Sequence, residues 1–143
     1  SKKAYKYSEF FKCPMALIDK RRSGNDDNAK AIHIIGNVKD KNALIFDDEI
    51  STGGTMMEAV KIVKECGARA VFAGCVHPVL CGNSIERIKD SELEELVVTN
   101  TIPIEPGKAI DKIKVLSIAP LFAETIKRNN EAKPVDDLFK NLD

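Results

Sequence analysis

Short apolar segments recur along the chain between stretches with a helical pattern. Several of them are apolar throughout, which is typical of strands covered on both faces of a sheet. Strands of this kind that alternate with helices form right-handed βαβ units. The pattern therefore predicts an α/β fold with a mainly parallel sheet flanked by helices. The six predicted strands are 14–18, 31–38, 42–46, 70–76, 95–102 and 112–118.

Four stretches have the spacing of apolar residues expected of helices, at 1–12, 54–66, 83–90 and 119–130. The second is the clearest, because Met56, Val60, Val63 and Cys66 form one apolar stripe and Gly67 follows as a helix stop.

The segments 31–38 and 42–46 are separated by only three residues, too few for a crossover helix. We therefore expect these two segments to form a β-hairpin preceding residues 47–55. No repeat or low-complexity block divides the chain, so a single domain over 1–143 is predicted.

The charge composition of the chain limits the kinds of partner that it attracts. The 22 basic and 22 acidic residues balance, so no net field attracts nucleic acid or an acidic membrane surface. No apolar run is long enough for a membrane span, and no secretory leader is visible, so a cytoplasmic location is expected.

The four cysteines include no CxxC pair and lie mostly in apolar segments, which favours buried, reduced thiols over disulfides or zinc ligands. They are Cys13, Cys66, Cys75 and Cys81.

The stretch LIFDDEISTGGT, residues 44–55, combines a strand with small and hydroxyl-bearing residues. Free N–H groups at a strand–loop–helix junction bind phosphate, and glycine allows close approach. Gly53 and Gly54 would form such a nest, with Ser51, Thr52 and Thr55 as added hydroxyl donors. The alternative is that Thr55 and Glu58 only form a capping box that starts the helix.

Asp47 and Asp48 narrow the choice of ligand. Carboxylates repel a bare phosphate, so they must face a neutral or cationic part of the ligand. A phosphorylated sugar satisfies both ends, because its hydroxyls, or Mg²⁺ held by them, would bind the two aspartates. Capping of a turn by the aspartates is the structural alternative. The acidic pair is also typical of receiver domains, but no phosphoacceptor Asp or Lys-Pro follows at later strand ends.

This order of residues is similar to the phosphoribosyl pyrophosphate-binding motif of type I phosphoribosyltransferase folds. Five further stretches resemble the C-terminal half of the ribose-phosphate pyrophosphokinase family, the phosphoribosyl pyrophosphate synthetases. They are CPMALIDKRR (13–22), HIIGNVKDKNALIFDD (33–48), HPVLCGNSIERI (77–88), ELVVTNTIP (95–103) and SIAPLFAETIKR (117–128).

The resemblance implies that pyrophosphate is transferred from ATP, with Mg²⁺, to the C1 hydroxyl of ribose 5-phosphate. The residues at 51–55 would hold the 5-phosphate, and Asp47 and Asp48 the ribose hydroxyls and metal. Lys20 and Arg22 would be catalytic cations on a flexible loop; without the resemblance, DKRR is typical of a solvated charge run. The family enzyme is longer, and its ATP-binding groups would lie in the part absent from this chain. The resemblance also implies homo-oligomers.

Some positions depart from the family pattern. The loop often has an acid where Ser51 stands, and Pro134 and Asp136 replace two serines that help bind regulatory phosphate or ADP. His77 could act as a base, but before Pro78 it more often organises a turn. His33, inside a strand, is a weaker candidate.

Two other functions remain open from sequence. One is a phosphoribosyltransferase that consumes phosphoribosyl pyrophosphate. The other is a non-catalytic subunit associated with the synthetase.

Overall fold

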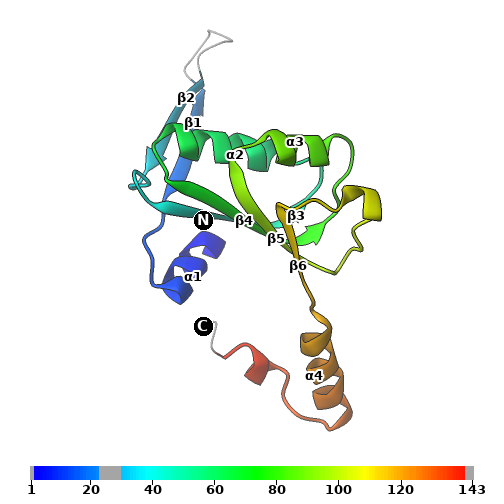
Figure 1. Cartoon of the computed structure of the whole chain (residues 1–143). Coiled ribbons are helices and arrows are strands. Elements are labelled where there is room, and N and C mark those ends of the chain that lie inside the picture. Colours follow the sequence, from blue (N-terminus) through cyan, green and yellow to red (C-terminus); the bar gives the residue numbers. More distant parts are fainter. Residues whose placement is uncertain (1, 23–29, 141–143) are drawn as a thin grey trace.

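The computed structural model describes residues 2–22 and 30–140 and has an open parallel sheet as its centre (Figure 1). The helices are α1 (Lys2–Phe11), α2 (Gly54–Glu65), α3 (Ser84–Asp90) and α4 (Ala119–Asn130), with short 3₁₀ turns η1 (Pro106–Lys108) and η2 (Asp136–Leu138). The strands are β1 (Leu17–Arg22), β2 (Lys30–Ile35), β3 (Asn42–Ile50), β4 (Ala70–Pro78), β5 (Leu93–Thr99) and β6 (Ile113–Leu116). The α/β class, the four helices and six strands near the expected positions are confirmed.

The central sheet has the order β3-β4-β5-β6, and every neighbouring pair is parallel. One face is covered by α2 and α3, whose apolar residues meet those of the sheet (Figure 1). The stripe on α2 is confirmed for Met56, Val60 and Val63, which are buried, whereas Cys66 is exposed. Burial of this apolar area is the main favourable contribution to folding.

The expected hairpin between 31–38 and 42–46 is wrong. A hairpin does precede the loop, but β2 pairs antiparallel with β1, while β3 pairs in parallel with β4. The turn between β2 and β3 explains the difference. Asp40 has a φ of 60° and its N–H donates to the Gly67 carbonyl at 2.9 Å, while the Arg69 N–H donates to the Lys41 carbonyl at 2.8 Å. These contacts hold the chain before β3 against the chain before β4, which favours parallel pairing.

The other face of the sheet meets α1. Tyr7 of α1 stacks on Phe46 of β3 with ring centroids 4.3 Å apart. Gly74 lies beside Phe46 in the β3–β4 register, and a Cβ there would stand 2.8 Å from the ring. The glycine therefore lets the aromatic ring lie across β4, which fixes where α1 packs.

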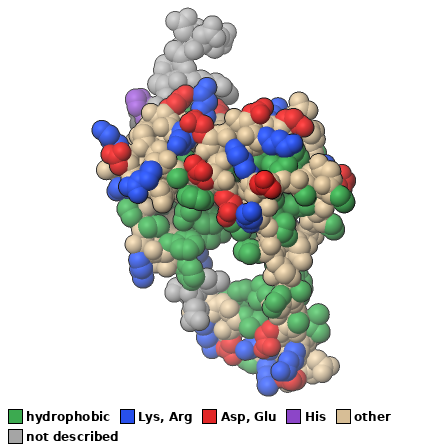
Figure 2. All heavy atoms as spheres, viewed as in Figure 1, with side chains coloured by type: hydrophobic (Ala, Val, Ile, Leu, Met, Phe, Trp, Pro, Cys, Tyr) green, Lys and Arg blue, Asp and Glu red, His purple; other side chains and the backbone are tan. Residues whose placement is uncertain are grey.

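The C-terminal segment extends away from the sheet (Figure 1). No residue of α4 is buried, and its apolar Leu121, Phe122 and Ile126 are exposed. Apolar side chains gather on this segment and along the part of the body nearest to it (Figure 2). Within the described ranges, no helix is both long and apolar enough to cross a membrane.

Candidate functional site

An open cavity of about 460 Å³ lies at the carboxyl end of β3, where ligands bind in open α/β sheets. Its lining is the continuous segment 47–56, which contains both aspartates and the whole hydroxyl- and glycine-rich loop. The structure thus brings together all seven residues expected to hold the sugar phosphate: Asp47, Asp48, Ser51, Thr52, Gly53, Gly54 and Thr55. Carboxylate acceptors lie at one end of this segment and backbone donors at the other.

The loop passes into α2 at Gly53. This residue has a φ of 75° and is the N-cap of α2, which makes no side-chain capping hydrogen bond. Thr55 is therefore the second residue of the helix, so the alternative of a capping box that starts at Thr55 is wrong. The first turn of a helix carries N–H groups with no partner inside the helix, so this end can donate to an anion.

A second segment, residues 79–87, follows β4 and contacts the loop that follows β3. The N–H groups of Leu80 and Cys81 donate to the carbonyls of Ile50 and Ser51, each at 3.1 Å. The hydroxyl of Ser51 also lies 3.1 Å from the Cys81 thiol. The loop is consequently held by contacts that the sequence pattern did not reveal.

The two aspartates are in different environments. The Asp48 carboxylate accepts a hydrogen bond from Lys3 Nζ at 2.6 Å, and the Asp48 N–H donates to Asp47 Oδ1 at 2.9 Å. The hydrogen bond from Lys3 lowers the pKa of Asp48, and the same bond raises the pKa of Lys3. Asp48 is thus ionised and already paired, so a ligand that binds it must compete with Lys3.

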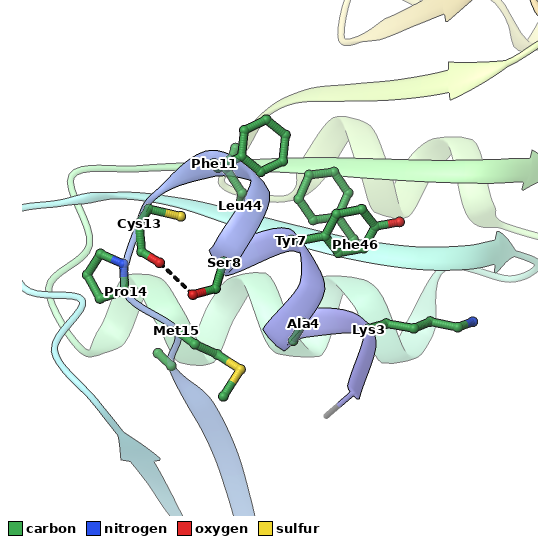
Figure 3. A pocket seen from close by; sticks show the side chains of 11 residues that line it. Lys3, Ala4, Tyr7, Ser8, Phe11, Cys13, Pro14, Met15, Leu44 and Phe46 are labelled. Atoms are coloured by element: carbon green, nitrogen blue, oxygen red, sulfur yellow. Dashed lines mark hydrogen bonds between the residues drawn. The ribbon is translucent and has the colours of Figure 1, made fainter. Parts of the chain in front are cut away.

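Lys3 also links the carboxylates to a second, smaller cavity of about 130 Å³ beside α1. Figure 3 shows aromatic and apolar side chains of α1 and β3 around it, with the Lys3 side chain extending away from the rings. The Ser8 hydroxyl closes the turn after α1 by donating to the Cys13 carbonyl at 2.7 Å.

The positions predicted for catalytic cations are only partly described. The backbone of Lys20 and Arg22 lies in β1, where it pairs with Ile32 and Lys30 of β2. The two residues therefore belong to a strand, whereas a flexible loop was expected. Their side chains lie outside the described part of the chain.

Neither histidine lines the cavity formed by residues 47–56. His77 Nδ1 lies 3.0 Å from the Thr101 hydroxyl, which itself donates to the Val76 carbonyl at 2.9 Å, so His77 organises the strand ends. His33 is an exposed residue of β2. Of the four free cysteines only Cys75 is buried, so the expectation of buried thiols is wrong for Cys13, Cys66 and Cys81.

The available side-chain donors limit the kind of metal site that the chain can form. Among the described residues, no group of three or more His, Cys, Asp or Glu could hold an ion. Mg²⁺, however, is commonly held by one or two carboxylates together with oxygens of a phosphorylated substrate. Asp47 and Asp48 fit that mode of binding, and they do not fit a site made of protein ligands alone.

A parallel sheet with an acidic strand end followed by a glycine-rich helix start is an arrangement typical of α/β proteins that bind phosphorylated ligands. Residues 2–140 match the family described as phosphoribosyl synthetase-associated domain. The chain belongs to this family.

Relatives of the chain and a solved structure support this family assignment. The chain is 47% identical over 139 residues to a ribose-phosphate pyrophosphokinase of Clostridium acetobutylicum, covering 97% of this chain and 43% of that protein. It is 48% identical over 137 residues to one of Halalkalibacterium halodurans, covering 96% and 43%. A phosphoribosylpyrophosphate synthetase structure from Mycobacterium smegmatis superposes with a TM-score of 0.80 at 34% identity, covering 92% of this chain and 43% of that one. The chain thus spans under half the length of these relatives.

Proposed function

We propose that the chain carries the ribose 5-phosphate site of a ribose-phosphate diphosphokinase. The observation that carries this proposal is the cavity lined by residues 47–56, in which the carboxylates of Asp47, Asp48 and Glu49 precede the hydroxyl- and glycine-rich loop. The names of the similar proteins, ribose-phosphate pyrophosphokinases, support the same reading.

In this proposal the 5-phosphate accepts hydrogen bonds from the backbone and hydroxyls of residues 51–55. The ribose hydroxyls donate to Asp47 and Asp48, for which they are better partners than an anion. With the sugar held at both ends, its C1 hydroxyl can approach the β-phosphorus of ATP in line, so that the pyrophosphoryl group transfers and AMP leaves.

Lys20 and Arg22 would neutralise the charge that spreads over the phosphate oxygens during the transfer. Mg²⁺, bound through the ribose hydroxyls and Asp47 and Asp48, would offset the charge of the transferred group. The residues of this chain would orient the acceptor and keep its phosphate fixed while the transfer takes place.

The donor side of the reaction would be supplied outside the described residues. We propose that the chain corresponds to the C-terminal half of a longer enzyme, on the resemblance of its five family-like stretches, and that the ATP-binding groups lie in the other half. A cytoplasmic homo-oligomer is proposed on the same grounds. The chain alone is expected to bind ribose 5-phosphate without turnover.

Calorimetric titration of the chain with ribose 5-phosphate and with phosphoribosyl pyrophosphate, with and without Mg²⁺, tests the proposal. Asp47→Asn and Thr55→Val are each expected to weaken binding by about tenfold, because each removes a hydrogen-bonding group that faces the ligand. A folded chain that binds neither compound would overturn the proposal. Pyrophosphate release on addition of a free base would indicate a phosphoribosyltransferase instead.

A further inference from the structure

Arg87 lies in α3, next to the loop but outside the cavity that the loop lines. Its Nη1 donates to the Thr52 carbonyl at 3.4 Å. A Cβ on Gly54 would stand 2.9 Å from the same nitrogen, so the guanidinium group rests against the start of α2. The neighbouring Ile85 and Ile88 are buried in the core, which fixes the helix from which Arg87 extends.

Three successive carbonyls of the loop are held from this side. Those of Ile50 and Ser51 accept from the N–H groups of Leu80 and Cys81, and that of Thr52 accepts from Arg87. Leu80 adopts a φ of 47°, which is unfavourable for a leucine, while its side chain is buried. Such strain is retained where the surrounding structure requires it.

Because the peptide unit is planar and trans, the contacts made by these carbonyls also set the direction of the neighbouring backbone N–H groups. In each peptide unit the carbonyl and the following N–H point in opposite directions. Carbonyls that point to residues 80–87 therefore direct the N–H groups of Ser51, Thr52 and Gly53 away from that segment. The cavity is lined by residues 47–56 and not by Leu80, Cys81 or Arg87, which agrees with a position on the side of the loop to which these N–H groups point.

We propose that Arg87 is a positioning residue of the anion site. By holding the Thr52 carbonyl, it aims the Gly53 N–H at the bound phosphate, and the 79–87 segment does the same for the two preceding N–H groups. This inference deepens the proposed function and rests on it, because it assigns the means by which the loop is prepared for the phosphate group. Preorganised donors bind an anion more tightly because no ordering cost remains at binding.

The side chain at position 87 provides the first test, with calorimetric titration of ribose 5-phosphate. Arg87→Met keeps most of the aliphatic stem and removes the donor, and we expect about tenfold weaker binding. Arg87→Lys retains a charged donor and is expected to restore most of the affinity. Arg69→Met is the matched control, since Arg69 Nη2 also donates to a backbone carbonyl, that of Asp40 at 2.8 Å, at the opposite end of the sheet.

Gly54→Ala provides a readout that a merely structural role would not give. Alanine favours a helix over glycine, so the melting temperature should be kept or raised. Its Cβ would displace the guanidinium group, so affinity should nevertheless fall to about the level of Arg87→Met. Because both changes remove the same contact, the double variant should bind no more weakly than either single one.

The outcomes separate the role of Arg87 from the proposed function. Unchanged binding by Arg87→Met, or additive losses in the double variant, would overturn the role of Arg87 while leaving the proposed function in place. If the unaltered chain binds no ribose 5-phosphate, the proposed function fails. The positioning role is then judged in the free chain, where Arg87→Met should shift the amide NMR signals of Ser51, Thr52 and Gly53 and Arg69→Met should not; unshifted signals contradict it.

Discussion

Lys3 pairs with Asp48, one of three carboxylates that line the cavity of the candidate site. Both side chains are largely exposed, at 71% and 61%, so the pair contributes little to stability and is screened by salt. Its effect is local, because Lys3 donates to Oδ2 of the carboxylate that we propose binds a sugar hydroxyl. Lys3 and Asp48 are 45 residues apart in the chain, which explains why no local pattern revealed their contact.

Removing the lysine should raise the pKa of Asp48. The hydrogen bond from Lys3 favours the ionised carboxylate, so its folded-state pKa lies below the unfolded one. The contribution of this contact is therefore present above the unfolded pKa and is lost as pH falls through the folded pKa. A carbon-detected NMR titration of the Lys3→Gln variant should show Asp48 protonating at higher pH than in the unaltered chain. Identical titration curves would show that the pair does not persist in solution.

Thiol reactivity distinguishes Cys75 from the other three cysteines. Burial raises the pKa of Cys75 to about 11, whereas Cys13, Cys66 and Cys81 are exposed. Because the thiolate is the reactive form, a colorimetric thiol reagent at pH 8 should modify three thiols in the folded chain and the fourth only after unfolding. Rapid modification of all four in the native chain would contradict the burial of Cys75.

At the scale of elements, the sequence was informative where a pattern has a local physical cause. The apolar stripe of α2 and the stop at Gly67 follow from helix periodicity and from a left-handed residue, with a φ of 88° at Gly67. The partner of β2 could not be obtained this way, because strand pairing depends on contacts distant in sequence. Two backbone hydrogen bonds favour the observed pairing. One joins Asp40 to Gly67, 27 positions apart, and the other joins Arg69 to Lys41, 28 positions apart.

The same distinction between local patterns and contacts distant in sequence applies to the candidate site. Residues 47–55 are consecutive, so their grouping could be read from the sequence. The support from Arg87 and the pairing with Lys3 come from other elements, and only the folded chain brings them to the loop and to Asp48.

The close contact between β3 and β4 gives a prediction about packing. Gly74→Ala places a Cβ 2.8 Å from the Phe46 ring, and forcing the ring aside should disturb its stack with Tyr7. We expect a loss of about 1–3 kcal/mol in the free energy of unfolding, which is typical of overpacking. In a Phe46→Leu background the same substitution should cost less. Equal losses in both backgrounds, measured by urea denaturation, would show that the ring is not what excludes the Cβ.

In the molecule as a whole, the C-terminal segment is held together by contacts between α4 and the residues that follow it. Arg128 of α4 donates to Glu124 at 2.8 Å and to the Pro134 carbonyl at 3.0 Å, which ties the helix to the residues that follow it. Pro134 and Asp136 are positions where the family pattern has serines. Neither can offer a hydroxyl, and Asp136 would repel an anion.

We therefore predict that an enzyme containing this segment is activated weakly or not at all by inorganic phosphate and is weakly inhibited by ADP at this site. The measurement is AMP production from ATP and ribose 5-phosphate at increasing phosphate. A Pro134→Ser/Asp136→Ser variant serves as the comparison, and it should gain phosphate dependence. A full-length enzyme that already requires phosphate would refute the prediction.

We propose that residues 47–55 bind the two ends of ribose 5-phosphate. The most direct measurement is an amide NMR titration of the chain with ribose 5-phosphate, using ribose and inorganic phosphate separately as comparison ligands. We expect ribose 5-phosphate to shift the signals of Asp47, Asp48 and residues 51–55 together, and phosphate alone to shift only those of the loop. Saturable shifts confined to another part of the molecule, or none in a folded chain, would contradict it.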